Sequence, residues 1–250
     1  MNWSSVILLV KRQFKEHRKL YLIALTLLVG LLAFMFLLIH NWRDSFTGAV
    51  ENGVFLIGLF LSGGLFTNTM FKEFSSKSEG IWLLNMPATS FEKVLSAVLL
   101  SSLGFLMVYV CLFLMVDGLY LMLTQQDRSA FDLFRNGFHE FIFVYLIFNG
   151  LVLLGRVTFV KYSLLKTMVL IIGGVILLNG FNNFSLEYMI PDLRVTSSMP
   201  FSGFQFRHAG ENVHVLLPAA TRALLMPFLW VLLPLSLWCI TWLKLKEKQI

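Results

Sequence analysis

Six apolar runs of membrane-spanning length constrain this fold more than any other feature of the sequence. A helix needs about 17–25 apolar residues to cross the hydrocarbon layer of a bilayer. The runs cover residues 20–39, 54–71, 94–123, 138–154, 167–180 and 223–243. The third run is too long for a perpendicular helix, so it must tilt or project from the bilayer. The sequence therefore predicts an all-α polytopic membrane protein with six transmembrane helices.

Composition excludes the main soluble classes. Apolar types make up 57% of the 250 residues and charged types 14%, against about 45–50% and about 25% in globular proteins. A soluble domain of this size could not bury so much apolar surface. Both cysteines, Cys111 and Cys239, lie inside apolar runs and are interpreted as small hydrophobic residues. Two prolines in the last run, Pro227 and Pro234, predict kinks.

The distribution of basic residues predicts the orientation. Six spans place both termini on the same side of the membrane. If that side is the cytoplasm, the cytoplasmic segments are 1–19, 72–93, 155–166 and 244–250. These segments carry fourteen of the 20 Lys and Arg residues, including every lysine. Cytoplasmic loops are enriched in Lys and Arg. We therefore expect both termini to be cytoplasmic.

The first 19 residues have the pattern of an amphipathic helix on the membrane surface. Apolar residues recur at helical spacing from Trp3 to Tyr21, and basic residues between Lys11 and Lys19 fill the other side. Such a helix binds the headgroup region of an anionic leaflet. The sequence predicts an N-terminal interfacial helix; a frayed basic tail that only fixes the topology is the alternative.

The connection between the second and third spans is much longer than a turn between antiparallel helices needs. Its segment Ile81–Met86 is nearly all apolar but too short to span, and it ends at Pro87. Thr89 or Ser90 can cap the next helix, and Glu92 in the first turn favours the helix dipole. The pattern predicts a short cytoplasmic helix suited to a partner's groove. An interfacial helix resting on lipid is the alternative.

This connection resembles the coupling-helix signature of the membrane subunits of type-two ABC exporters. It reads Ser78-Glu79-Gly80-Ile81-Trp82-Leu83-Leu84-Asn85-Met86-Pro87, followed by Glu92 and Lys93. It departs from that signature at Asn85 and Met86, where a fully apolar helix end is commoner. The likeness covers nearly the whole chain, with an elbow helix before the first span and an external insertion before the sixth. It implies that the ATPase subunit is contacted by Glu79, Gly80, Ile81, Trp82, Leu83, Leu84, Met86 and Pro87.

The resemblance also implies an assembly. Residues 1–250 would form one transmembrane permease domain that lines the pathway of an exporter. This chain would pair with a second permease subunit, identical or homologous. Two ABC ATPase subunits would drive the pair. This chain would bind no cofactor, because ATP and Mg would bind the ATPase subunits. The expected location is the bacterial cytoplasmic (inner) membrane. Membrane lipid is expected as a further partner, and nucleic acid is not.

The segment 181–221, between the fifth and sixth spans, is predicted to be an external insertion. Asn182, Asn183 and Pro191 are typical of turns. Alternating apolar residues flank Ala209-Gly210-Glu211-Asn212 and predict a small β-hairpin: Phe204, Phe206, Val213 and Val215. A disordered outer loop is the alternative.

Three polar residues in the predicted spans are candidates for pathway or subunit contacts: Asp117, Asn149 and Asn179. Polar groups inside a membrane are costly and mark function by default. Asp117 lies toward the end of a long helix, so an interfacial, solvated carboxylate is the alternative and the one we favour from sequence. The same two interpretations apply to Asn149 and Asn179.

The sequence holds no catalytic or metal-binding motif. No Gly-x-x-x-x-Gly-Lys-[Ser/Thr] occurs, so this chain cannot bind ATP in a P-loop. The pairs Gly63–Gly64 and Gly173–Gly174 lie in spans and favour close helix packing. Two other functions stay open: a non-catalytic assembly component, and a membrane enzyme acting on lipid or glycan. The enzyme would use external residues: His40, His139, His208, His214, Glu140, Glu187 and Glu211.

Overall fold

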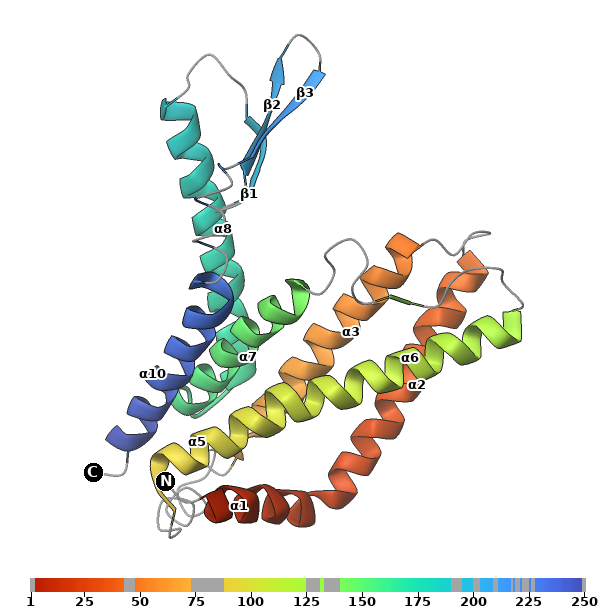
Figure 1. The fold of residues 1–250 in the computed structure, drawn as a ribbon, viewed down its shortest axis with the longest axis vertical. Helices are drawn as coiled ribbons and strands as arrows, with labels where there is room; N and C mark the ends of the chain where they lie inside the picture. Colours follow the sequence, from red (N-terminus) through yellow and green to blue (C-terminus); the bar gives the residue numbers. More distant parts are fainter. Residues whose placement is uncertain are drawn as a thin grey trace. The chain divides into compact units, whose positions relative to one another are not determined.

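The computed structural model describes residues 3–42, 48–72, 88–124, 131–132, 140–189, 195–199, 203–208, 211–216, 218, 221, 225 and 228–248. Within these ranges, six helices are long and apolar enough to cross a membrane. They cover Arg18–His40, Val50–Thr69, Ser90–Thr124, Glu140–Thr158, Ser163–Tyr188 and Phe228–Glu247 (Figure 1). The chain is therefore a multi-pass membrane protein, which confirms the prediction from the apolar runs.

The chain forms two compact units, the first with residues 1–164 and 236–250 and the second with residues 165–235. The first unit contains α1 (Trp3–Glu16), α2 (Arg18–Trp42), α3 (Gly48–Thr69), α5 (Ser90–Val98), the π-helical segment η2 (Leu99–Gly104), α6 (Phe105–Thr124) and α7 (Glu140–Thr158). Helix α8 (Ser163–Met189) begins in the first unit and continues in the second, whereas α10 (Leu233–Glu247) begins in the second and ends in the first.

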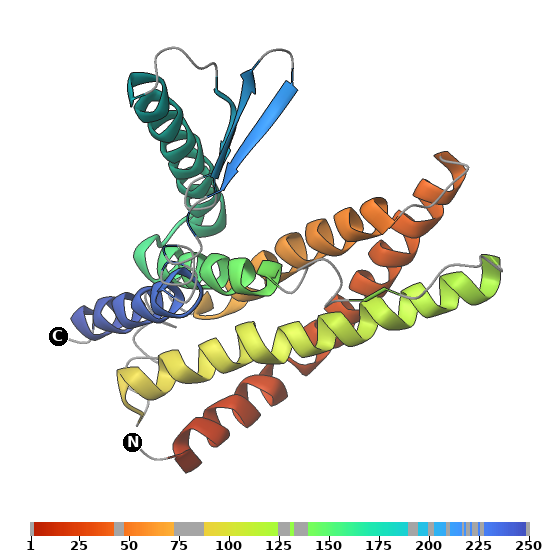
Figure 2. The same ribbon diagram turned by 45° about the horizontal axis from the view of Figure 1, so that its top comes forward.

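Helix α1 presents a different environment on each side. Val6 is buried, and the helix packs against α5 (Figure 2). The neighbouring side of the helix exposes Trp3, Ile7 and Phe14. Lys11 is exposed on the side beyond these residues. An apolar side beside a basic side suits a helix in the membrane interface. These residues therefore form a packed helix rather than a frayed tail; their contact with the membrane stays a prediction.

The third span is one continuous helix of 35 residues that joins α5, η2 and α6. At about 1.5 Å per residue such a helix is about 52 Å long, against about 30 Å of hydrocarbon. Thr89 is its N-cap, one of the two residues predicted for that position. The expected excess length is present, so part of this helix must tilt or extend beyond the hydrocarbon.

Aromatic side chains hold α2, α3 and α6 together in what we call the aromatic core. Its buried residues are Leu32, Phe36, Val54, Phe55, Leu59, Phe105, Tyr109, Phe113, Val116, Tyr120, Phe131 and Tyr145. The rings of Phe55 and Phe113 meet edge to face at 5.0 Å, and the Tyr109 hydroxyl donates to the Phe55 carbonyl at 2.8 Å. Helices in lipid associate through such packing and hydrogen bonds, because lipid is itself apolar.

A second cluster, the basal cluster, joins α3, α5, η2, α7 and α10. Its buried residues are Met70, Phe71, Val94, Ala97, Val98, Leu100, Leu153, Val157 and Leu245. Val10 of α1 packs against it. The N-terminal helix and the end of the last helix therefore lie at the same end of the first unit, as an even number of spans requires.

The second unit differs from the predicted external insertion in two ways. Helix α8 continues to Met189, nine residues beyond the predicted end of the fifth span at residue 180. Asn182 and Asn183 lie inside this helix rather than in turns. The sheet has three antiparallel strands in the order β1 (Val195–Met199), β2 (Gly203–His208) and β3 (Glu211–Leu216). Strands β2 and β3 occupy the place of the predicted hairpin, and β1 was not predicted.

The last span contains a change of helix type. A π-helical segment, η4 (Phe228–Leu232), passes directly into α10. Pro234 is the second residue of α10, and a proline has no N–H to donate into the helix. Such single-turn π segments are typical of places where helix geometry is locally altered. Pro227, the other predicted kink, lies outside the described residues.

Candidate functional site

The predicted ATPase-contact residues, from Glu79 to Pro87, lie outside the described residues. The structure does describe both ends of the connection that carries them. At the first end, Met70 and Phe71 are buried in the basal cluster. Phe71 has a φ of 56°, in the left-handed region that commonly ends a helix. The chain thus leaves α3 through a buried, sharply turned residue.

Side chains from two other helices hold this first end. Gln13 of α1 donates to the Met70 sulfur at 3.1 Å. From α7, the Arg156 guanidinium donates to the Lys72 carbonyl at 3.2 Å, and Arg156 is only 7% exposed. The exit from α3 is therefore attached to α1 and α7.

The other end of the connection is fixed by a capping box. The Thr89 hydroxyl accepts from the Glu92 N–H at 3.3 Å, and the Thr89 N–H donates to a Glu92 carboxylate oxygen at 3.1 Å. Reciprocal bonds of this kind satisfy two orphan donors at a helix start. Glu92 and Lys93 are both buried, in line with the packing of α5 against α1. The sequence predicted the cap, but it assigned Glu92 only a dipole effect.

The end of α10 is attached to α7 at the same end of the unit. The Lys248 ammonium donates to the Val157 carbonyl. Partial burial lowers the pKa of Lys248 from its usual value. Val157 also belongs to the basal cluster, so the last helix is held there by both apolar packing and a hydrogen bond.

A buried polar network, which we call the core polar network, lies between α3, η2 and α7. The Asn149 amide donates to the Thr67 hydroxyl at 2.8 Å and to the Ser101 hydroxyl at 3.0 Å. The Tyr145 hydroxyl donates to the Ser101 carbonyl at 2.8 Å. All four residues are completely buried. Asn149 stands out in the sequence, but the other three residues of the network do not, since Ser, Thr and Tyr are common in spans.

The π-helical geometry of η2 and a glycine of α3 make this network fit. A π-helical turn displaces backbone groups from the ordinary α-helical pattern, and here the Ser101 carbonyl accepts from another helix. A Cβ atom on Gly63 would lie 2.5 Å from the Tyr145 ring. The packing role predicted for Gly63 is therefore present. Around Gly173 and Gly174, no described atom lies within 4 Å of such a Cβ.

Asp117 lies inside the protein, so our favoured sequence interpretation of a solvated, interfacial carboxylate is wrong. It is completely buried, and one carboxylate oxygen accepts from the Phe131 N–H at 3.0 Å. Phe131 stacks on Phe55 in the aromatic core at 5.0 Å. The sequence could not show this, because Phe131 returns to α6 from a connection with no regular pattern. A part in the pathway or in a subunit contact stays a prediction.

Asn179 differs from Asn149 in its surroundings. Its amide donates to the Val175 carbonyl one turn earlier on α8, at 2.9 Å, on an exposed surface. The neighbouring residues Leu177 and Leu178 are also exposed. The Asn179 amide therefore hydrogen-bonds within its own helix, whereas the Asn149 amide hydrogen-bonds from α7 to α3 and η2.

The strand register bears on the proposed external His and Glu residues. His208 pairs with Glu211, and His214 pairs with Gln205. The two histidines therefore do not pair with each other in the sheet. In the described part of the chain, no three His, Cys, Asp or Glu residues gather as a metal site would require.

Comparison with known proteins adds no relative: no family model, no curated protein and no solved structure matches this chain.

Proposed function

We propose that this chain is the membrane-spanning permease subunit of an ABC exporter, driven by separate ATPase subunits. The support is the order of its parts: a helix before the first span, six spanning helices, a long connection after α3 and an inserted sheet before the last span. The connection carries the apolar segment Ile81–Met86. A single membrane chain has little reason to expose such a surface to the cytoplasm.

One observation carries the proposal. Both ends of the 73–87 connection are anchored in or beside the basal cluster, through Met70 and Phe71 before it and Val94 after it. That cluster takes residues from α3, α5, η2, α7 and α10, and α1 packs against it. A force on the connection would therefore reach every one of these helices together, which is what a transmission element needs.

The proposed cycle is a two-state change driven from the cytoplasmic side. Closure of two ATPase subunits around ATP and Mg would push the coupling helix of each permease subunit. The push would move the basal cluster and so reorient the spans of two paired permeases, identical or homologous. ATP shifts the equilibrium only because it favours the closed state of the ATPase subunits. In this proposal both termini and the connection are cytoplasmic.

The test is loss of the ATPase subunit on substitution of the coupling helix. A buried aromatic side chain commonly dominates such an interface, and its truncation costs about 2 kcal/mol, or about thirtyfold in affinity. We expect Trp82→Ala and Leu83→Asp to abolish co-purification of a P-loop ATPase in mild detergent, with normal protein abundance. Gly80→Val should act in the same direction, because it restricts the turn into the helix.

The matched control is Lys77→Ala, which removes a charge from the same connection and should change little. The captured protein must be identified by mass spectrometry as a P-loop ATPase that hydrolyses ATP. The permease proposal is wrong if the wild-type chain captures no such ATPase. It is also wrong if Trp82→Ala and Leu83→Asp both leave the capture of the ATPase and its ATP hydrolysis unchanged.

A further inference from the structure

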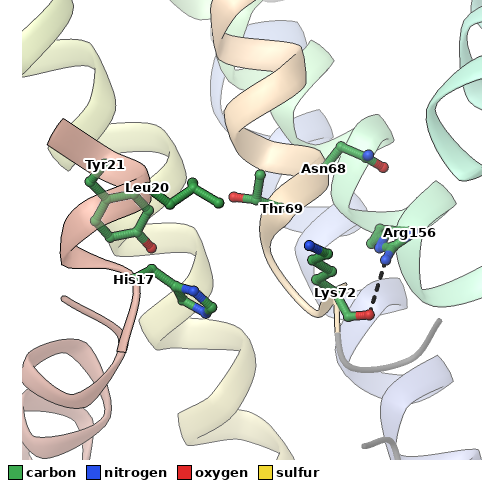
Figure 3. Close-up of a pocket in the computed structure, with 7 residues that line it drawn as sticks. All are labelled: His17, Leu20, Tyr21, Asn68, Thr69, Lys72 and Arg156. Carbon is green, nitrogen blue, oxygen red and sulfur yellow. Dashed lines mark hydrogen bonds between the residues drawn. The ribbon is translucent and has the colours of Figure 1, made fainter. Parts of the chain in front are cut away.

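A cavity of about 200 Å³ lies where the α1–α2 junction meets the end of α3. One wall carries His17, Leu20 and Tyr21, and the other carries residues of α3, of the turn after α3 and of α7 (Figure 3). The residues of this second wall are Asn68, Thr69, Lys72 and Arg156. The cavity holds several water volumes at about 30 Å³ each, which is room for a small polar group. It is separate from the core polar network.

The charge of the lining favours an anion. Lys72 and Arg156 contribute two positive charges, and none of the seven lining residues is acidic. The guanidinium of Arg156 is fixed by its bond to the Lys72 carbonyl at 3.2 Å, so its planar group is already oriented (Figure 3). A guanidinium recognises phosphate oxygens through paired N–H donors, and a lysine adds a mobile charge. His17 and Tyr21 offer further polar hydrogens on the opposite wall.

Asn68 adds a requirement for a hydrogen-bond donor. Its side-chain oxygen is buried and has no hydrogen-bond partner among the described residues. Buried polar atoms without a partner are rare and call for an explanation. A hydroxyl or ammonium group beside a bound phosphate would donate to this oxygen.

An exposed apolar stripe on α2 begins at the cavity. Leu20 at the rim is 43% exposed. Further apolar residues continue from it along one side of the helix, all of them exposed: Ile23, Leu27, Leu31 and Phe34. Their spacing of three and four residues keeps them on one stripe. This stripe offers a path for an acyl chain whose headgroup lies at Leu20.

We propose that this cavity binds a phosphate group that carries a neighbouring hydrogen-bond donor, as in the headgroup of an anionic phospholipid. Lys72 and Arg156 hold the phosphate, and Asn68 accepts from the donor. The acyl chains lie along α2. The proposal does not rest on the proposed function and holds whether or not an ATPase subunit binds.

The test uses the purified full chain in detergent and measures thermal stability against added phosphatidylglycerol. This lipid is anionic and its headgroup carries hydroxyl donors. Phosphatidylcholine, which is zwitterionic and has no headgroup donor, is the lipid control, and inorganic phosphate is the soluble probe. Loss of one charge near the membrane surface weakens binding of an anionic lipid about fivefold. We therefore expect saturable stabilisation by phosphatidylglycerol, with half-saturation at about fivefold more lipid in Lys72→Gln.

Two further variants make the result specific. Lys161→Gln removes an exposed lysine five residues beyond Arg156, outside the cavity, and should titrate like wild type. Arg156→Gln should weaken binding further. Lys72→Gln decides the outcome, because the Lys72 side chain is exposed and its backbone carbonyl still accepts from Arg156 in the variant. If inorganic phosphate competes with phosphatidylglycerol, the cavity is still an anion site, but its ligand is a soluble phosphate. No saturable effect of either probe, or equal titrations for Lys72→Gln and Lys161→Gln, overturns the proposal.

Discussion

Gly63 lies where the ring of Tyr145 crosses α3, so a single methyl group at this position has no room. The added Cβ would be 2.5 Å from the ring. Overpacking of this kind costs about 1–3 kcal/mol. We expect Gly63→Ala to lower the melting temperature of the protein in detergent. Gly53→Ala, on the same helix with no heavy atom within 4 Å, should not lower it, because alanine favours a helix over glycine. Equal melting temperatures for the two variants would contradict the packing of α3 against α7.

Asp117 has a structural effect that hydrogen exchange can measure. Asp117→Leu removes the acceptor of the Phe131 N–H, and a buried N–H without a partner costs about 1–3 kcal/mol. We expect the Phe131 amide to exchange about tenfold faster, as about 1.4 kcal/mol of lost protection implies. Asp117→Asn keeps an acceptor oxygen and should preserve most of the protection. Unchanged exchange in Asp117→Leu would show that the carboxylate does not hold this residue.

At the residue scale, the sequence predicted which residues are unusual but not what they contact. Asn149 stands out as a polar residue in an apolar run, whereas Ser101 and Thr67 do not, because hydroxyl side chains commonly bond to their own helix in a span. The contact depends on η2 and on the register of three helices. Neither can be deduced from one sequence.

At the scale of elements, Thr89 caps the longest of the described helices, and substitution of Thr89 tests this cap. Thr89→Ala removes the hydroxyl that accepts from the Glu92 N–H, and loss of an N-cap costs about 0.5–2 kcal/mol. We expect a lower melting temperature and faster proteolysis within residues 73–87. Thr89→Ser keeps the cap and should behave like wild type. Proteolysis that is equally slow in both variants would contradict an anchored start of α5.

Element boundaries were predictable where apolar content changes sharply and not where it changes gradually. The first span follows its apolar run closely, since basic residues precede it. Helix α8 continues nine residues past its predicted end because Phe181, Phe184 and Leu186 still support a helix. The two asparagines there are only weak helix breakers. Strand β1 was missed because Val195–Met199 lacks the alternation that marked β2 and β3.

At the scale of the whole molecule, the number of spans followed from hydropathy alone, because lipid forces each run to satisfy its own backbone bonds. The side of each connection depends instead on the distribution of charge. Every lysine lies in segments assigned to the inside, and the basal cluster places α1 and the end of α10 together. The permease proposal requires that end to be cytoplasmic.

Cysteine labelling in intact cells tests this requirement most directly. The native thiols are first removed by Cys111→Ala and Cys239→Ala, and a single cysteine is then introduced by Lys77→Cys or Asn212→Cys. We expect a membrane-impermeant thiol reagent to label the Asn212→Cys protein in intact cells, because β3 is predicted to be external. It should label the Lys77→Cys protein only after the membrane is opened. Labelling of Lys77→Cys in intact cells would contradict the orientation and remove the basis for a cytoplasmic coupling helix.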